Sequence, residues 1–352
     1  MKRYLVLQNG TVFEGEAFGA AAEGIGELVF TTGMNGYIET LTDPSYCGQI
    51  VLQTFPMIGN YGVIPADFEG KCHVRGYVVR EWCERPSNFR SEKTLDEYLK
   101  EIGVPGICGI DTRAVTKLLR EQGTMNAGIF DSVPTDLSAV ADYAVTGAVE
   151  TVTCDRPETI SPDGDVKFRV ALMDYGKKNN IERSLAARGC EVTVFPAATK
   201  AEEILAGGFD GVMLSNGPGD PADNTFEIGE IGKLMGKLPV FGICLGHQLM
   251  AIAQGGKTVK LKYGHRGVNQ PVREAGSHRT FISSQNHGYA VVSDSVPGGR
   301  ETFINANDGT CEGMSYDAMN AFSVQFHPEA CAGPKDTAFL FDEFIKRMGG
   351  DR

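Results

Sequence analysis

The strongest constraint on the fold is the alternation of strand and helix patterns that begins at Phe168. Short apolar runs predict strands at 168–173, 191–195, 211–214 and 240–243, and helical periodicity predicts helices at 180–188, 201–205, 226–235 and 245–254. Strands and helices that alternate at this spacing form right-handed β-α-β units, with a largely parallel sheet covered by helices on both faces. Ligand sites in such sheets form in loops at the carboxyl ends of the strands. We therefore expect chemistry in the loops after Leu214, Ile243 and Gln325.

The first half of the chain follows a different pattern. Short strands separated by glycine turns are predicted at 4–7, 11–14, 26–31, 50–55 and 77–79, with helical periodicity only at 94–102 and 111–122. We interpret residues 1–150 as a β-rich mixed domain and residues 168–352 as the α/β domain. Proline and glycine interrupt both periodicities in residues 151–167, which we predict to be a linker. A chain of 352 residues has room for two such domains.

Composition excludes several classes of protein. A net charge of −12 opposes non-specific binding to nucleic acid or to an anionic membrane surface. No window approaches the roughly 18 consecutive apolar residues of a membrane span. The nine cysteines are scattered and form no CxxC pair of the kind that zinc or redox sites use. We therefore expect a reduced, cytoplasmic chain with no nucleic-acid partner, no membrane partner and no metal site.

One cysteine stands in a pattern that predicts a nucleophile. Residues 240–248 read Val-Phe-Gly-Ile-Cys-Leu-Gly-His-Gln, so that a strand meets a helix at Cys244, with Gly242 and Gly246 on either side. This is the nucleophile-elbow pattern with sulfur in place of oxygen, and the start of a helix favours the thiolate. A buried structural cysteine is the alternative interpretation. His247, inside the elbow, is a candidate base, but we expect it to face neighbouring loops instead.

A base for this thiol is predicted where the last strand ends. Residues 322–329 read Phe-Ser-Val-Gln-Phe-His-Pro-Glu and place His327 two residues before Glu329. Residues i and i+2 of an extended segment point the same way, so the carboxylate can fix one imidazole tautomer while the other nitrogen faces the thiol. Cys244, His327 and Glu329 thus satisfy the logic of a catalytic triad. A strand-end histidine with a purely structural role is the alternative.

A third motif follows the strand that ends at Leu214. Residues 215–221 read Ser-Asn-Gly-Pro-Gly-Asp-Pro, a turn that can present backbone N–H groups to an oxyanion. A glycine-rich turn can also hold phosphate, but this one lacks the Lys-Ser/Thr ending of a phosphate-binding loop.

Together, the three motifs resemble those of the class I glutamine amidotransferases, in the order found in that family. Further motifs at 33–46, 55–60, 109–113 and 285–289 resemble the small-chain family of carbamoyl-phosphate synthase. The resemblance implies that Cys244 attacks the side-chain amide of L-glutamine, forming a thioester and releasing ammonia. It implies that His327 moves the proton, that Glu329 orients His327, and that the N–H groups of Gly219 and Leu245 hold the oxyanion.

The resemblance also implies a set of substrate contacts. Tyr289 departs from the phenylalanine that is usual in the family, and we expect His287 to shape the pocket without carrying protons. The residues implied to contact L-glutamine are Ser45, Gly217, Gly219, Leu245, Gln248, Asn286, Gly288 and Tyr289.

The partner is implied by chemistry that the chain lacks. The sequence shows no phosphate-binding loop with its lysine and no acidic metal cluster, so we expect no cofactor in this chain. The resemblance implies a heterodimer, or a higher assembly, with a large subunit that uses ATP and magnesium to make carbamoyl phosphate from bicarbonate for arginine and pyrimidine biosynthesis. The β-rich domain would dock that partner. Three alternatives remain: the amidotransferase chain of another synthase, a free-standing γ-glutamyl hydrolase, and a non-catalytic docking protein.

Overall fold

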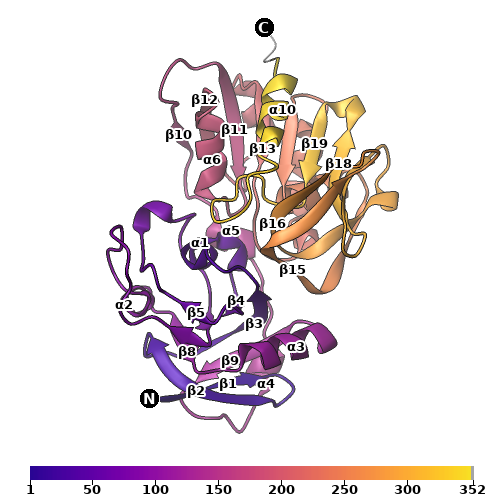
Figure 1. Cartoon of the computed structure of the whole chain (residues 1–352). Helices are drawn as coiled ribbons and strands as arrows, with labels where there is room; N and C mark the ends of the chain where they lie inside the picture. Colours follow the sequence, from indigo (N-terminus) through magenta and orange to yellow (C-terminus); the bar gives the residue numbers. More distant parts are fainter. Residues whose placement is uncertain (350–352) are drawn as a thin grey trace. The chain divides into compact units, whose positions relative to one another are not determined.

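The boundary between the two units of the chain falls between Ala148 and Val149 in the computed structural model, which describes residues 1–349 (Figure 1). Each unit has its own sheet and its own core. We describe the units one at a time.

The N-terminal unit is built on a closed barrel with the strand order β1-β2-β8-β6-β4-β3-β9. Strands β3, β4, β6 and β8 are paired in parallel, and the other pairings in the barrel are antiparallel. The barrel strands are β1 (Lys2–Leu7), β2 (Val12–Gly19), β3 (Gly24–Thr31), β4 (Gln49–Gln53), β6 (Gly76–Val78), β8 (Pro105–Cys108) and β9 (Met125–Phe130). The remaining strands and α-helices are β5 (Met57–Ile58), which pairs with β7 (Glu81–Trp82), and α1 (Tyr37–Thr42), α2 (Leu95–Glu101), α3 (Thr112–Gln122) and α4 (Ser138–Ala141).

Helices α2 and α3 begin where their sequences supply caps. The Thr94 side chain accepts a hydrogen bond from the Glu97 N–H, and Glu97 returns one to the Thr94 N–H, which completes a capping box. Asp111 accepts from the Ala114 N–H at the start of α3. Both predicted helices are therefore confirmed, and so are the five strand regions predicted in this half.

Strands β8 and β9 close the barrel, and the sequence did not predict them. Each contains a glycine that breaks the strand pattern. A Cβ on Gly106 would lie 2.6 Å from the ring of Phe18, and one on Gly128 would lie 2.2 Å from the ring of Phe130. The glycines leave room for aromatic rings that pack over the strands, a tertiary requirement that no local pattern reveals.

The C-terminal unit holds a sheet with the order β10-β12-β11-β13-β14-β19-β18-β17-β15-β16. Its central strands, β12 (Cys190–Pro196), β11 (Phe168–Asp174), β13 (Gly211–Leu214), β14 (Val240–Ile243) and β19 (Ala321–Val324), are parallel. Helix α5 (Ala148–Val152) begins at the boundary between the units, and the other α-helices of this unit are α6 (Asn179–Ala186), α7 (Ala201–Ala206), α8 (Thr225–Leu234), α9 (Leu245–Ala253) and α10 (Phe339–Arg347). The alternation predicted from Phe168 onward is thus confirmed.

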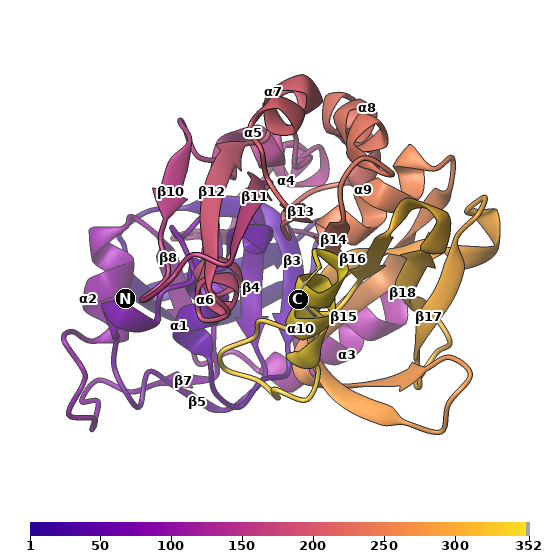
Figure 2. The same ribbon diagram turned by 90° about the horizontal axis from the view of Figure 1, so that it is seen from above.

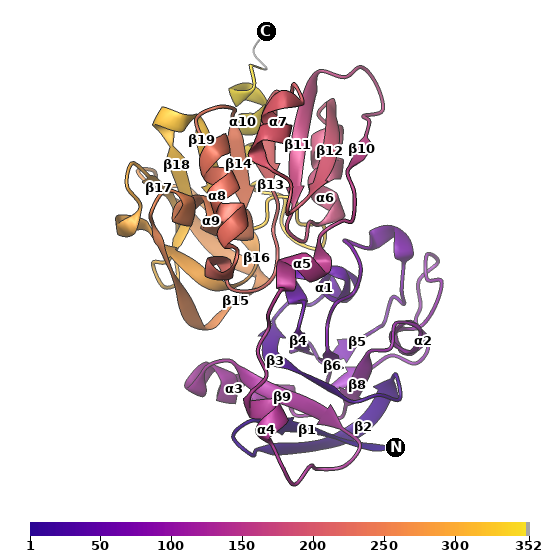
Figure 3. The same ribbon diagram turned by 180° about the vertical axis from the view of Figure 1, so that it is seen from behind.

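Helices cover both faces of the parallel strands, as Figure 2 shows from above. Helices α7, α8 and α9 pack on the face seen in Figure 3, against Ala171, Val212 and Val240. Helices α6 and α10 pack on the opposite face, against Val170 and Phe241. Successive residues of a strand point to opposite faces, so each buried strand contributes to both layers of the core.

Half of the sheet is antiparallel, which the sequence did not predict. Strands β15 (Lys257–Glu274), β16 (Thr280–Val292), β17 (Arg300–Asn305) and β18 (Cys311–Tyr316) extend it from β19. On the other edge, β10 (Glu158–Ile160) pairs with β12. Part of the segment predicted as a linker, residues 151–167, therefore belongs to the sheet. Among residues 1–349, no helix has the length and apolar character needed to cross a membrane.

Candidate active site

Cys244 occupies a strained turn between β14 and α9. Its φ of 53° and ψ of −100° lie outside the regions that non-glycine residues prefer. Strain of this kind persists only where the surrounding structure enforces it, and it is common at functional sites. A Cβ on Gly246 would lie 2.5 Å from the Leu214 carbonyl oxygen, so the turn requires glycine at that position.

The thiol of Cys244 is enclosed by amide groups and is only 2% exposed. Its Sγ donates to the Asn286 carbonyl oxygen at 3.6 Å and accepts from Nε2 of Gln325 at 3.6 Å. Nε2 of Gln248, on α9, donates to the Tyr289 carbonyl oxygen at 2.8 Å and to Oε1 of Gln325 at 2.9 Å. These contacts bring the elbow, β16 and the end of β19 to one place.

The buried His327 and Glu329 form a charged group with the partly buried Lys178 beyond the end of β19. Nδ1 of His327 lies 2.7 Å from Oε1 of Glu329, so the i and i+2 positions meet as their spacing suggests. Lys178, at the start of α6, places its Nζ 3.2 Å from Nδ1 of His327 and 3.5 Å from Oε1 of Glu329. Nε2 of His327 is buried and makes no hydrogen bond.

The electrostatics of this group favour a protonated imidazole. Burial and the Lys178 ammonium lower the pKa of His327, but the Glu329 carboxylate and the Cys244 sulfur raise it, to a net value of about 9. Burial raises the pKa of Glu329, whereas His327 and Lys178 lower it to about 2. The carboxylate is therefore ionised at neutral pH, and the imidazole is electrostatically coupled to the sulfur of Cys244.

Backbone contacts tie the loops after β11, β13 and β14 together. The N–H of Gly246 donates to the Ser215 carbonyl oxygen at 3.0 Å, which fixes the elbow to the loop after β13. The Lys178 N–H donates to Oδ1 of Asn216 at 3.1 Å. Ser215 and Asn216 are fully buried. The carboxyl ends of four parallel strands thus hold Cys244, the glycine-rich loop, Lys178 and His327 at one edge, an arrangement able to carry out nucleophilic chemistry with a paired acid or base.

Comparison with known proteins gives this arrangement a family. A family model for the carbamoyl-phosphate synthase small chain, CPSase domain, matches residues 5–129, and one for class I glutamine amidotransferases matches residues 171–347. The carbamoyl phosphate synthase small chain of Clostridium perfringens (strain 13 / Type A) is 52% identical over 352 residues, covering 98% of this chain and 99% of that protein. The chain belongs to the carbamoyl phosphate synthase small chain family.

Other members of the small-chain family match over similar lengths. The carbamoyl phosphate synthase small chain of Listeria monocytogenes serotype 4b (strain F2365) is 51% identical over 355 residues, covering 99% of this chain and 97% of that protein. That of Syntrophotalea carbinolica is 48% identical over 373 residues, covering 100% of this chain and 99% of that protein. The family inferred from the sequence motifs is therefore confirmed, and the chain contains a class I glutamine amidotransferase domain.

His247 and Ser45 are two positions of this small-chain family member for which the sequence made specific predictions. His247 is fully buried, and its Nδ1 lies 2.8 Å from Oγ of Ser323 on β19. The expectation that it faces neighbouring loops was wrong, because the first turn of α9 directs this side chain onto the sheet. Burial lowers the pKa of His247 to about 3, which keeps it neutral. Ser45 belongs to the N-terminal unit, where its N–H donates to Oδ1 of Asp43, and its predicted contact with glutamine stays a prediction.

Sequence reasoning missed Lys178 and Gln325. Lys178 follows the strand β11, and a basic residue in a loop at the carboxyl end of a parallel strand is the signal that could have indicated it. Gln325 stands inside the motif that contains His327, but its role as a donor to the thiol depends on the pairing of β14 with β19, which the sequence does not specify.

Proposed function

We propose that this chain hydrolyses L-glutamine through a thioester on Cys244 and delivers the ammonia to a large, ATP-dependent chain. The observation that carries the proposal is the strained Cys244 at the end of β14, beside β19, whose end leads to the buried His327–Glu329 pair, in a member of the small-chain family. The catalytic and binding roles that we assign to individual residues are part of this proposal, and so are the partner and the pathway.

The proposed reaction has two halves. In the first, the Cys244 thiolate attacks the side-chain carbonyl carbon of glutamine, and the protonated His327 gives its proton to the leaving nitrogen, so that ammonia departs and a thioester remains. In the second, neutral His327 takes a proton from water, whose oxygen attacks the thioester. The tetrahedral intermediate then expels the Cys244 thiolate, and glutamate leaves after its new carboxyl group loses a proton to solvent. His327 keeps the proton that it took from water, so the starting pair of thiolate and imidazolium is restored. Glu329 supports both halves by orienting and stabilising the imidazolium.

The proposed oxyanion hole uses two backbone N–H groups. Leu245 is the first residue of α9, and the first N–H groups of a helix have no partner inside it. Gly219 adopts a φ of 89°, a conformation open to glycine, in the loop after β13. We propose that glutamine is contacted by the residues that the family resemblance implies: Ser45, Gly217, Gly219, Leu245, Gln248, Asn286, Gly288 and Tyr289.

The proposed partner is the large subunit of carbamoyl-phosphate synthase, in a heterodimer or a higher assembly. In this proposal the large subunit binds ATP and magnesium, the small chain needs no cofactor, and the carbamoyl phosphate serves arginine and pyrimidine biosynthesis in the cytoplasm. Ammonia would travel by an enclosed path, because in water near neutral pH it is protonated and loses its nucleophilic lone pair. The N-terminal unit, to which we assign no chemistry of its own, would dock the partner.

The test is reconstitution with the large chain. Mixing both purified chains should give carbamoyl phosphate from either glutamine or free ammonia. The Cys244→Ser variant should lose the glutamine-dependent product and keep the ammonia-dependent one. If the variant kept both, Cys244 would not be the nucleophile. If the isolated chain hydrolysed glutamine at full rate with no response to the large chain, it would be a free-standing hydrolase.

A further inference from the structure

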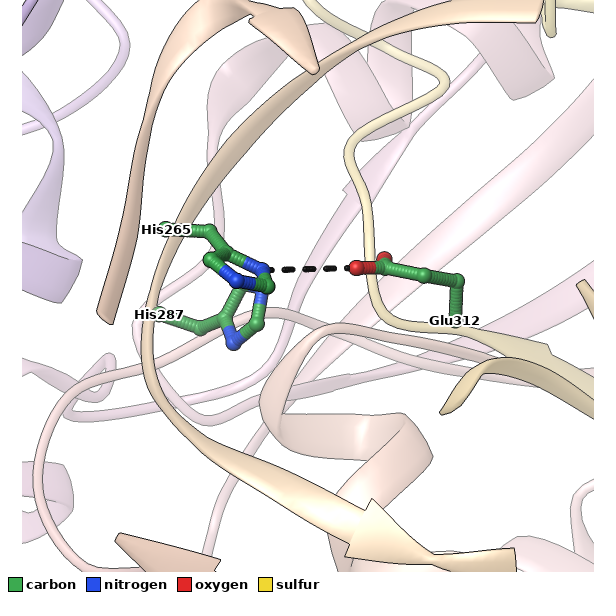
Figure 4. Close-up of side chains that lie close together, drawn as sticks. All are labelled: His265, His287 and Glu312. Carbon is green, nitrogen blue, oxygen red and sulfur yellow. Dashed lines mark ion pairs between the residues drawn. The ribbon is translucent and has the colours of Figure 1, made fainter. Parts of the chain in front are cut away.

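Two histidines and a glutamate meet inside the antiparallel half of the C-terminal sheet. His265 on β15 and His287 on β16 are directly opposite each other in the strand register, and Glu312 lies on β18 (Figure 4). All three are buried, with Glu312 at 0% exposure. The sequence alone gave no reason to expect a metal here, because the three positions are far apart along the chain.

We propose that His265, His287 and Glu312 form a binding site for a divalent metal ion of the zinc class. Each residue offers one ligand atom, and these atoms lie within 4.8 Å of one another. Nδ1 of His265 and Oε1 of Glu312 are 3.4 Å apart. Ligand atoms around a tetrahedral zinc with metal–ligand bonds of about 2.0–2.2 Å are separated by roughly 3.3–3.6 Å. One pair already has this spacing, and a pair of atoms at the 4.8 Å limit would need to close by roughly 1.2–1.5 Å to match it.

The outer contacts of both histidines fix the tautomers that a metal needs. Nε2 of His265 lies 2.8 Å from Oδ2 of Asp308, which accepts its proton and leaves the lone pair on Nδ1, on the Glu312 side. Nδ2 of Asn305 lies 3.4 Å from this Nδ1 and would give up that contact to a bound metal. Nδ1 of His287 lies 2.8 Å from the Tyr289 carbonyl oxygen, which can only accept, so Nε2 carries the lone pair. Histidines that bind metals usually donate their other N–H to a carboxylate or a backbone carbonyl. His265 is placed to donate to the Asp308 carboxylate, and His287 to the Tyr289 carbonyl oxygen.

The carboxylate supplies an independent observation. Oε2 of Glu312 is buried and has no hydrogen-bond partner, while Oε1 accepts from Nδ2 of Asn305 at 3.0 Å. A buried carboxylate oxygen without a partner is costly, and a bound cation would offset that cost. Two imidazoles and one carboxylate are ligands that suit zinc, with a further position left for water.

A cluster without metal is the competing interpretation. A protonated His265 would bridge Asp308 and Glu312 by ion pairs. The amide of Gln285, whose Oε1 lies 3.1 Å from Nε2 of His287, would turn over to donate to that nitrogen. This arrangement satisfies both rings with protons alone and leaves Oε2 of Glu312 unpartnered. The two interpretations therefore differ in whether the full-length chain binds a metal ion at these residues.

Metal binding to the full-length chain tests the proposal without any assay of activity. After treatment with a chelator, the chain is titrated with Zn²⁺ in competition with a chromophoric chelator, and with Co²⁺ followed by absorption spectroscopy. We expect one equivalent of metal, with a cobalt spectrum typical of nitrogen and oxygen ligands. Glu312→Gln should abolish this binding, and Asp308→Asn should weaken it about 10–100-fold through loss of its support for His265. His278→Asn, which changes an exposed histidine in the turn between β15 and β16, is the matched control and should bind normally.

Three outcomes would overturn the proposal. The first is metal binding by the unmodified chain no tighter than by Glu312→Gln. The second is a cobalt spectrum with the sulfur charge-transfer band of a thiolate ligand, which would place the metal on a cysteine. The third is unchanged affinity in Asp308→Asn, whose side chain is 43% exposed and whose replacement the fold should tolerate. Because the readout is metal affinity, the result is independent of whether the proposed glutaminase activity is correct.

Discussion

The two units of the chain use their buried polar groups in different ways. In the N-terminal unit, these groups mostly satisfy the backbone: Thr42 Oγ1 donates to the Ile38 carbonyl oxygen, and Asp43 accepts from the Ser45 N–H. In the C-terminal unit, some buried side chains also satisfy the backbone, as Asn216 does for the Gly176 carbonyl oxygen, but others pair with one another, as His327 does with Glu329. We interpret the N-terminal groups as supports of the fold, and the His327–Glu329 pair as a group that can take part in the proposed chemistry.

Backbone strain follows the same division. Among residues 1–349, the non-glycine residues with positive φ are Cys244 and Asn320, both in the C-terminal unit. Asn320 occupies a left-handed turn before β19, which asparagine tolerates, whereas the conformation of Cys244 is unusual for any side chain. Substitutions at Cys244 and at the His327–Glu329 pair should therefore change catalysis, and substitutions of buried polar groups in the N-terminal barrel should change stability alone.

The largest effect is expected at Cys244. Replacing the sulfur by oxygen in Cys244→Ser removes the nucleophile and should lower kcat/KM for glutamine hydrolysis by about 10⁴-fold or more. Cys311→Ser, at a buried cysteine on β18, is the matched control, with kcat/KM close to that of the unmodified chain in the fraction that folds. Equal losses in the two variants would contradict a special role for Cys244.

The charges around His327 should move the pH profile in opposite directions. Glu329 raises the pKa of His327, so Glu329→Gln should lower it and shift the alkaline limb of kcat/KM to lower pH, with a rate loss of about 10²-fold. Lys178 lowers the same pKa, so Lys178→Met should shift that limb to higher pH. The unmodified chain should lose activity as the pH rises through about 9, where His327 gives up its proton. If the alkaline limb shifted in the same direction in both variants, the loss of activity at high pH would not be caused by deprotonation of His327.

The elbow should tolerate no added methyl group. Gly246→Ala would place a Cβ 2.5 Å from the Leu214 carbonyl oxygen, which should destabilise the unit by about 1–3 kcal/mol and displace Cys244. Gly232→Ala on α8 meets no atom closer than 4.0 Å and should leave stability the same or higher. Chemical denaturation combined with glutaminase assays measures both effects. Normal stability and activity of Gly246→Ala would contradict the claim that the elbow has no room for a side chain at position 246.

The barrel gives the smallest and purely structural effect. Arg3 is 2% exposed, and it donates to the carbonyl oxygens of Ala20 and Gly106 and pairs with the half-exposed Asp131. Arg3→Met should lower the free energy of unfolding by about 1–2 kcal/mol and leave kcat for glutamine unchanged. Lys2→Met, at an exposed side chain, should change stability little. A loss of kcat in folded Arg3→Met would contradict the claim that buried polar groups of the N-terminal barrel affect stability alone.

The parallel half of the sheet was predictable because its signals are local. Buried strands and amphipathic helices have periods that can be read directly, and the motifs around Cys244 and His327 lie where strands end. Barrel closure through β8 and β9 was not predictable, because Gly106 and Gly128 are set by rings that pack over them. Lys178 is far from His327 in the sequence and lies next to it only in the folded chain. In the same way, His265, His287 and Glu312 come together only when β15, β16 and β18 pair in the sheet.

The most direct test of the central claim is the mass of the chain during turnover. Full-length chain mixed with glutamine and quenched in acid should carry a glutamyl adduct, equal to glutamine less ammonia, and peptide mapping should place it on Cys244. The adduct should be absent from Cys244→Ser. An adduct on another residue, or turnover of glutamine with no adduct at any quench time and an active Cys244→Ser chain, would contradict the proposed mechanism.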